Sequence, residues 1–177
     1  MNAYLSFAPL PGGGQTNANK GVGGDGGVVI GPGWDVVLTH NALVDGLNLF
    51  AGTSTVEQNA TLGDLDSEAY GFTFAIGGAT IGYQTSEMDN VGASGTFYDT
   101  DAYAVSYSVN DDLSISYGVA ESQSNSGSTG DVEAQSFQVS YSVGGASIVF
   151  AESAVDNQNY VSGTNRSGRT VAVTLAF

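Results

Sequence analysis

The chain has 177 residues, enough for one domain of ordinary size, and it contains 26 glycines, 3 prolines and no cysteine. The lack of cysteine excludes disulfides and cysteine metal sites. A formal net charge of −15, from 18 acidic and 3 basic residues, disfavours nucleic acid as a partner, because phosphates need Lys and Arg for neutralisation. No apolar run is long enough for a transmembrane helix, and a hydrophobic content of 41% with regular patterning argues against disorder.

The first part of the chain predicts two strands separated by a loop. Residues 2–9 are typical of a short strand, residues 10–27 form a Gly-rich loop, and residues 28–42 resume an extended segment. No secretory signal peptide precedes them, and we expect a single domain over residues 1–177 that is truncated at its N-terminus.

Hairpin signals then recur about every 33 residues. Each unit consists of a strand, a tight turn, a second strand and a longer polar loop. The turns are expected at Asp45-Gly46, Gly77-Gly78, Asp111-Asp112 and Gly144-Gly145. The strands are expected at residues 47–56, 68–76, 79–86, 101–109, 113–121, 134–143, 146–153 and 169–177, which gives nine strands from residue 28 and ten with the first segment.

Alternation along these strands separates large apolar from small polar residues. One face is expected to stay continuous and exposed, and it carries Phe72, Phe74, Tyr107, Ile115, Tyr141, Phe150 and Leu175. The opposite face is too small and too polar to fill a dry core. Its predicted pore-lining residues are Thr73, Gln84, Ser106, Ser108, Ser114, Ser116, Gln138, Ser140, Ser142 and Thr174.

Acidic residues are absent from the central part of the predicted strands and are assigned to the long loops, at one mouth of the structure. This predicted acidic mouth consists of Asp64, Asp66, Glu87, Asp89, Asp99, Asp131 and Glu133. A β-sandwich also alternates. Exclusion of charge from the strands, strictly unequal loop lengths and an apolar face rich in Tyr and Phe favour instead an antiparallel up-and-down transmembrane β-barrel. Ten strands would close a lumen of roughly 20 Å backbone diameter, and the small inward residues favour a water-filled, wider barrel.

The chain ends in the pattern Val171-x-Val173-x-Leu175-x-Phe177. Together with the hairpin period and the Tyr-rich strands at 102–118, it resembles the C-terminal part of a Gram-negative general porin of the alphaproteobacterial type. The resemblance covers residues 34–177. It implies a barrel of about sixteen strands, a homotrimer, contact with outer-membrane lipid, and recognition of the terminal strand by the barrel-assembly machinery.

The expected function is passive diffusion of small hydrophilic solutes across the bacterial outer membrane, with a preference for cations. The alternative is a secreted acidic, Gly-rich adhesin or a calcium-stabilised surface protein. No Ser/His/acid constellation indicates catalysis, so we expect no enzyme activity, no cofactor and no metal.

Overall fold

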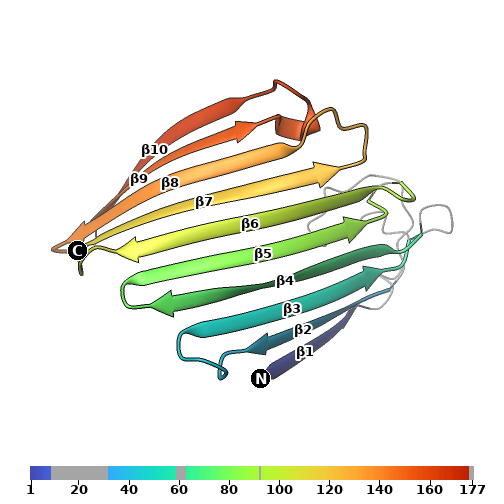
Figure 1. Cartoon of the computed structure of the whole chain (residues 1–177), viewed down its shortest axis with the longest axis horizontal. Coiled ribbons are helices and arrows are strands. Elements are labelled where there is room, and N and C mark those ends of the chain that lie inside the picture. The colour runs from blue at the N-terminus through green and yellow to red at the C-terminus, as the bar shows by residue number, and fades with distance from the viewer. Residues whose placement is uncertain (9–31, 59–62, 92, 176–177) are drawn as a thin grey trace.

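A computed structural model describes residues 1–8, 32–58, 63–91 and 93–175, and these form one antiparallel sheet (Figure 1). The predicted 10–27 loop and Phe177 lie outside the described residues. A three-residue 3-10 turn, η1 (Gln158–Tyr160), interrupts the last connection. The strands are β1 (Asn2–Ala8), β2 (Gly33–His40), β3 (Leu47–Val56), β4 (Leu65–Ile76), β5 (Ala79–Asp89), β6 (Phe97–Ser108), β7 (Leu113–Ser124), β8 (Val132–Val143), β9 (Ala146–Asp156) and β10 (Arg166–Leu175).

The spatial order of the ten strands is their sequence order, and each neighbouring pair is antiparallel. The predicted up-and-down topology without crossovers is therefore confirmed. Figure 1 shows the short connections along one end of the sheet, called here the hairpin end, and the long connections along the other, called the loop end. Gly144 and Gly145 both have positive φ, 57° and 83°. A two-residue type I′ hairpin turn, whose twist matches that of the flanking strands, requires positive φ at both positions.

The strands run further toward the loop end than alternation predicts. The strand expected at 101–109 begins at Phe97, the one expected at 68–76 begins at Leu65, and the one expected at 113–121 continues to Ser124. Charged residues are poor strand formers, and each of these three predicted strands has a carboxylate at its loop end: Asp101, Glu68 and Glu121. In the structure, backbone pairing with both neighbouring strands carries the ladder past the carboxylates.

The sheet is open. The order begins at β1 and ends at β10, and these two strands do not pair with each other, so the closure expected of a barrel is not present. All described residues of both edge strands are exposed. An edge strand presents a row of unpaired backbone N–H and C=O groups that can pair with another strand.

The described residues form no conventional hydrophobic core. Val56 and Leu65, which are 5% and 8% exposed, are the buried apolar side chains among them. Large apolar side chains on the same sheet remain exposed, including Tyr70, Ile81, Val105 and Val171. A single-layer sheet of this kind leaves both faces uncovered, and a protein sheet normally buries at least one of them.

Candidate functional site: two faces and an acidic end

The ten predicted pore-lining residues share one face of the sheet, called here the polar face. The register shows this directly, because Ser106 lies opposite Ser116 and Ser116 lies opposite Gln138. A second row, one step nearer the hairpin end, joins Ser108, Ser114 and Ser140. These hydroxyls and amides form a continuous hydrophilic surface across β6, β7 and β8.

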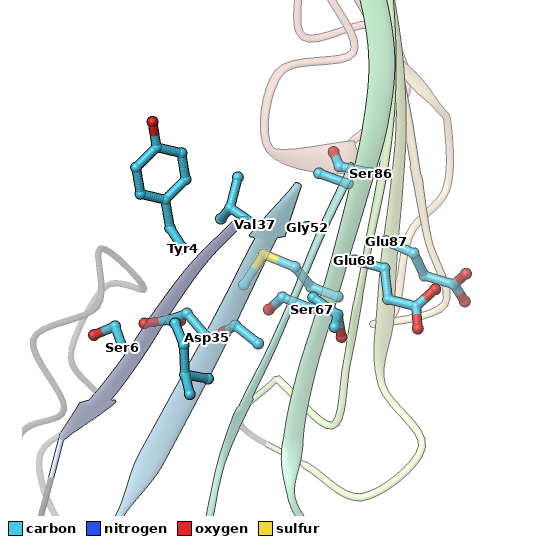
Figure 2. A pocket seen from close by; sticks show the side chains of 14 residues that line it. Tyr4, Ser6, Asp35, Val37, Gly52, Ser67, Glu68, Ser86 and Glu87 are labelled. Atoms are coloured by element: carbon cyan, nitrogen blue, oxygen red, sulfur yellow. The ribbon is translucent and has the colours of Figure 1, made fainter. Parts of the chain in front are cut away.

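Charge is nearly absent from the polar face. Among the described strand residues on this face, Asp35 on β2 and Arg166 on β10 are the ones with charged side chains. Small side chains leave two shallow hollows on it. The first, of about 490 Å³, lies across β1 to β5 near the loop end, and Tyr4, Val37, Ser54 and Met88 are among its lining residues (Figure 2).

The opposite face, called here the apolar face, carries all seven residues predicted for it. None of the seven is buried: Tyr107, Ile115, Tyr141 and Leu175 are exposed, and Phe72, Phe74 and Phe150 are half-buried. The predicted continuous face is confirmed by the register, in which one row joins Phe74, Ile81, Val105, Tyr117 and Phe137.

Aromatic rings form a row near the loop-end margin of the apolar stripe. The ring centroids of Phe72 and Tyr83 are 6.3 Å apart, and those of Tyr83 and Tyr103 are 5.2 Å apart. The Tyr83 hydroxyl donates to Asp101 Oδ1 at 2.7 Å. Rings with an apolar body and a hydrogen-bonded polar tip suit a boundary between an apolar and a wet environment.

The acidic residues predicted to lie in loops require a correction. Only Asp64 and Asp131 of that set lie in connections; the others lie within strands and on the apolar face. They are Asp66 on β4, Glu87 and Asp89 on β5, Asp99 on β6 and Glu133 on β8. The apolar face is thus divided along its length, with apolar side chains toward the hairpin end and carboxylates toward the loop end.

The register places carboxylates directly opposite one another. Asp66 lies opposite Asp89, and Glu68 lies opposite Glu87. These four residues, with Thr53 and Thr55, line a hollow of about 370 Å³. Figure 2 shows Glu68 and Glu87 side by side, pointing away from the side on which Tyr4 and Val37 lie. Like charges directly opposite in an antiparallel pair are destabilising, yet among the described residues these carboxylates do not converge into a group that could hold a metal ion.

A second acidic row crosses β6 to β9, where Asp101, Glu121, Glu133 and Asp156 occupy successive opposing positions. The nearby Glu152 has a cationic partner, since Arg169 donates to its Oε1 at 2.9 Å across β9 and β10.

Asparagines that the sequence reasoning missed join the long connections to one another. Asn90 Nδ2 donates to the Asp64 carbonyl and its Oδ1 accepts from Gly95 N. Asn157 repeats this arrangement toward the Asp131 carbonyl and Gly163 N. A sequence signal existed, because both connections begin with Asp-Asn and continue to Ser-Gly-Thr, at 89–96 and 156–164.

Asn125 supplies the bridge between these two pairs. Its Nδ2 donates to the Gly95 carbonyl and its Oδ1 accepts from Phe97 N. The connections that follow β3, β5, β7 and β9 are therefore linked side by side through asparagine amides. Asn90 and Asn157 adopt left-handed backbone conformations, with φ of 59° and 54°, which asparagine tolerates better than most residues.

The predicted assembly signal lies on the exposed edge strand β10. Val171, Val173 and Leu175 share the apolar face and are 66%, 61% and 58% exposed. The fourth residue of the signal, Phe177, is outside the described range.

No protein-family model matches the chain, and a search of curated proteins returns no match. Among the described residues no helix has the length and hydropathy needed to cross a membrane.

Proposed function

We propose that this chain forms the wall of an outer-membrane porin, through which small hydrophilic solutes diffuse passively. The observation that carries the proposal is the pair of uncovered faces: a continuous apolar face with exposed Ile, Val, Tyr and Phe, backed by a face that is rich in Ser, Thr, Gly, Ala and Gln. Lipid against the first face and water against the second would satisfy both. A soluble monomer rarely leaves so large an apolar surface exposed.

The division of the apolar face along its length supports the same arrangement. On β6 the apolar stripe ends at Tyr103, in the aromatic row with Phe72 and Tyr83, and carboxylates begin one step beyond it, at Asp101. On β9, Glu152 lies opposite Phe137, nearer the hairpin end, and is paired with Arg169. In a membrane-spanning barrel, aromatic girdles lie at the interfaces and charge lies outside the hydrocarbon. The hairpin end would then face the periplasm and the loop end the cell exterior, with the edges of β1 and β10 paired to further strands in a closed, wider barrel.

The alternative of a calcium-stabilised surface protein has less support. Stacked coils of a solenoid would place parallel strands side by side, whereas all nine strand pairs here are antiparallel hairpin neighbours. We also propose the outer membrane as the location, a homotrimer as the assembled state and the barrel-assembly machinery as the partner of β10.

Selectivity for cations is part of the proposal, and its source is mainly the carboxylates on the strands at the loop end, instead of carboxylates in the loops. The polar face contributes Asp35 and Arg166, which are of opposite sign, whereas the carboxylates gather at the loop-end rim. A negative rim raises the local concentration of cations near the opening. This bias should weaken as salt rises, because the Debye length falls from about 10 Å at 0.1 M to about 3 Å at 1 M.

The test is the reversal potential across a planar bilayer under a KCl gradient, measured with the complete chain that contains these residues. The proposed function predicts discrete conducting steps, and it predicts cation selectivity that declines between low and high salt. Replacing the rim residues Asp131 and Glu133 by Asn and Gln should reduce the selectivity without abolishing conduction. A wild-type chain that inserts into lipid without conducting would refute the pore.

A further inference from the structure

The connection between β9 and β10, residues 157–165, folds across the polar face instead of extending away from the sheet. Its Tyr160 hydroxyl lies 2.8 Å from Ser122 Oγ on β7. Its ring packs edge-on against Tyr98 on β6, with centroids 5.4 Å apart and an interplanar angle of 61°. Ser122 and Tyr98 both lie on the polar face, because they share the parity of Ser116 and Ser106 along their strands.

This reach is long for a hairpin connection. Strands in a sheet are about 4.8 Å apart, so a residue that follows β9 crosses β8 and β7 before its ring meets β6. From β9 to β6, the backbone of the connection and the Tyr160 side chain together span roughly 14 Å across the strands. Of the loop-end connections that the structure describes, this one places an aromatic side chain over the polar face.

The connection is held firmly in this position. Thr129, in the connection before β8, donates its backbone N–H to the Tyr160 carbonyl at 2.9 Å, and its Oγ1 accepts from Ser162 N at 3.0 Å. Within the connection, Thr164 Oγ1 lies 2.7 Å from the carbonyl oxygens of both Gln158 and Val161.

The backbone of Tyr160 is strained, with a φ of 59° in the left-handed region. Asn157 and Asn159, at 54° and 58°, also lie there, but asparagine tolerates this region far better than an aromatic residue does. Such strain persists only where the surroundings over-determine the conformation, and it concentrates at functional positions. Here the hydroxyl contact, the ring contact and the Thr129 bonds supply those surroundings.

A hollow begins one same-face position from Ser122, the residue that the Tyr160 hydroxyl contacts. Ala102 and Ala120 are the next residues on the polar face after Thr100 and Ser122, toward the hairpin end. They begin a hollow of about 410 Å³, whose lining on this face is Val155 and the small residues Ala102, Ala104, Gly118, Ala120, Ala134, Ser136 and Ser153. The Tyr160 ring, with Tyr98 beside it, thus lies at the loop-end margin of a surface lined mostly by small side chains.

We propose that Tyr160 is a size-selecting residue of the solute path: a fixed aromatic projection that narrows the passage at the loop end. The proposal rests on the porin function proposed above, since only a solute path along the polar face would meet this ring. The solutes are the small hydrophilic molecules of the proposed function, and the ring limits the width of those that pass.

The experiment measures single-channel conductance and the exclusion of neutral polyethylene glycols of graded size, for the full chain in planar bilayers. Tyr160→Asn removes the ring and keeps a residue suited to the left-handed backbone. It should raise conductance and shift the polymer cut-off to larger sizes. Tyr160→Phe keeps the ring and loses only the hydroxyl contact, so its cut-off should stay closer to that of the wild type.

A matched control exists on the other face. The Tyr117 hydroxyl donates to Gln135 Oε1 at 2.9 Å on the apolar face, so Tyr117→Phe removes one comparable tyrosine hydroxyl bond away from the solute path. It should leave both conductance and cut-off unchanged.

A thiol probe provides a second, independent readout, because the chain has no native cysteine. Tyr160→Cys should react with a charged methanethiosulfonate reagent added to the open channel, and the adduct should lower the conductance. The same reagent should leave Tyr117→Cys channels unaffected.

The outcomes separate the two proposals. A wild-type chain that never conducts overturns the porin function and this inference with it. A conducting wild type whose polymer cut-off is unchanged in Tyr160→Asn, and whose Tyr160→Cys form is insensitive to the reagent, overturns the role of Tyr160 alone.

Discussion

The opposite environments of the two faces can be tested with neighbouring residues of one strand. Val105 and Ser106 are consecutive on β6, so their side chains point to opposite faces. Val105 lies midway between Tyr103 and Tyr107, about 7 Å from each along the strand at roughly 3.3 Å per residue. Val105 therefore marks the middle of the apolar stripe, where hydrocarbon would be deepest.

Replacing each residue by arginine should give very different costs. An arginine at the bilayer midplane of a β-barrel costs about 2–4 kcal/mol, which corresponds to a roughly 30- to 700-fold shift in the folding equilibrium. We therefore expect Val105→Arg to lower the free energy of unfolding by this amount. Ser106→Arg should change it by less than about 0.5 kcal/mol, because its side chain would remain in water.

The assay is urea-induced unfolding of the chain folded into lipid vesicles. Trp34, the single tryptophan, lies at the loop end of the apolar face and is 40% exposed, so its fluorescence reports the unfolding of the sheet. Equal costs for the two variants, or a larger cost for Ser106→Arg, would refute the reasoning. That result would mean that the polar face is the buried one and that the sheet packs against protein.

Three further changes test details of the sheet. Gly71→Ala would place a Cβ against the backbone oxygen of Tyr83 on β5 and should destabilise by about 1–3 kcal/mol in urea titrations, whereas Gly82→Ala meets nothing nearer than 3.6 Å and should cost less than about 0.5 kcal/mol. Glu121→Gln removes two directly opposing carboxylate pairs and should raise the free energy of unfolding by roughly 0.4–2 kcal/mol at low salt. This stabilisation should shrink at 1 M salt, and a stabilisation of the same size there would contradict its electrostatic origin. Asn157→Ala should speed amide hydrogen exchange at Gly163, whose N–H it leaves without its acceptor; unaltered exchange would show that the asparagine bridge does not hold the connection.

The strands and their two faces could be predicted from the sequence because both depend on neighbouring residues. Side chains alternate with a period of two, so the pattern around Phe72 or Ser106 assigns a face before any partner strand is known. The turns could also be predicted from neighbouring residues. Paired glycines such as Gly144-Gly145 supply the positive φ that a two-residue hairpin needs, and connections this short leave only antiparallel neighbours.

The placement of the carboxylates was decided by the tertiary structure. Asp99 and Glu133 are poor strand residues by local propensity, which placed them in loops. Pairing with two neighbouring strands overrides that propensity, and the register then fixes them on the apolar face. Whether β1 meets β10 is likewise a property of the whole sheet, since tilt and stagger accumulate over all strands.

The position of Tyr160 shows the same division at a single residue. Its sequence neighbours predict a polar connection and nothing more, because a tyrosine after a strand carries no information about which distant strand it will meet. Its contact with Ser122, 38 residues earlier, exists only because three strands are laid side by side and Thr129 holds the connection over them. Alternation and turn chemistry are short-range effects that the sequence encodes directly, whereas a contact across several strands depends on the register of every pair between them.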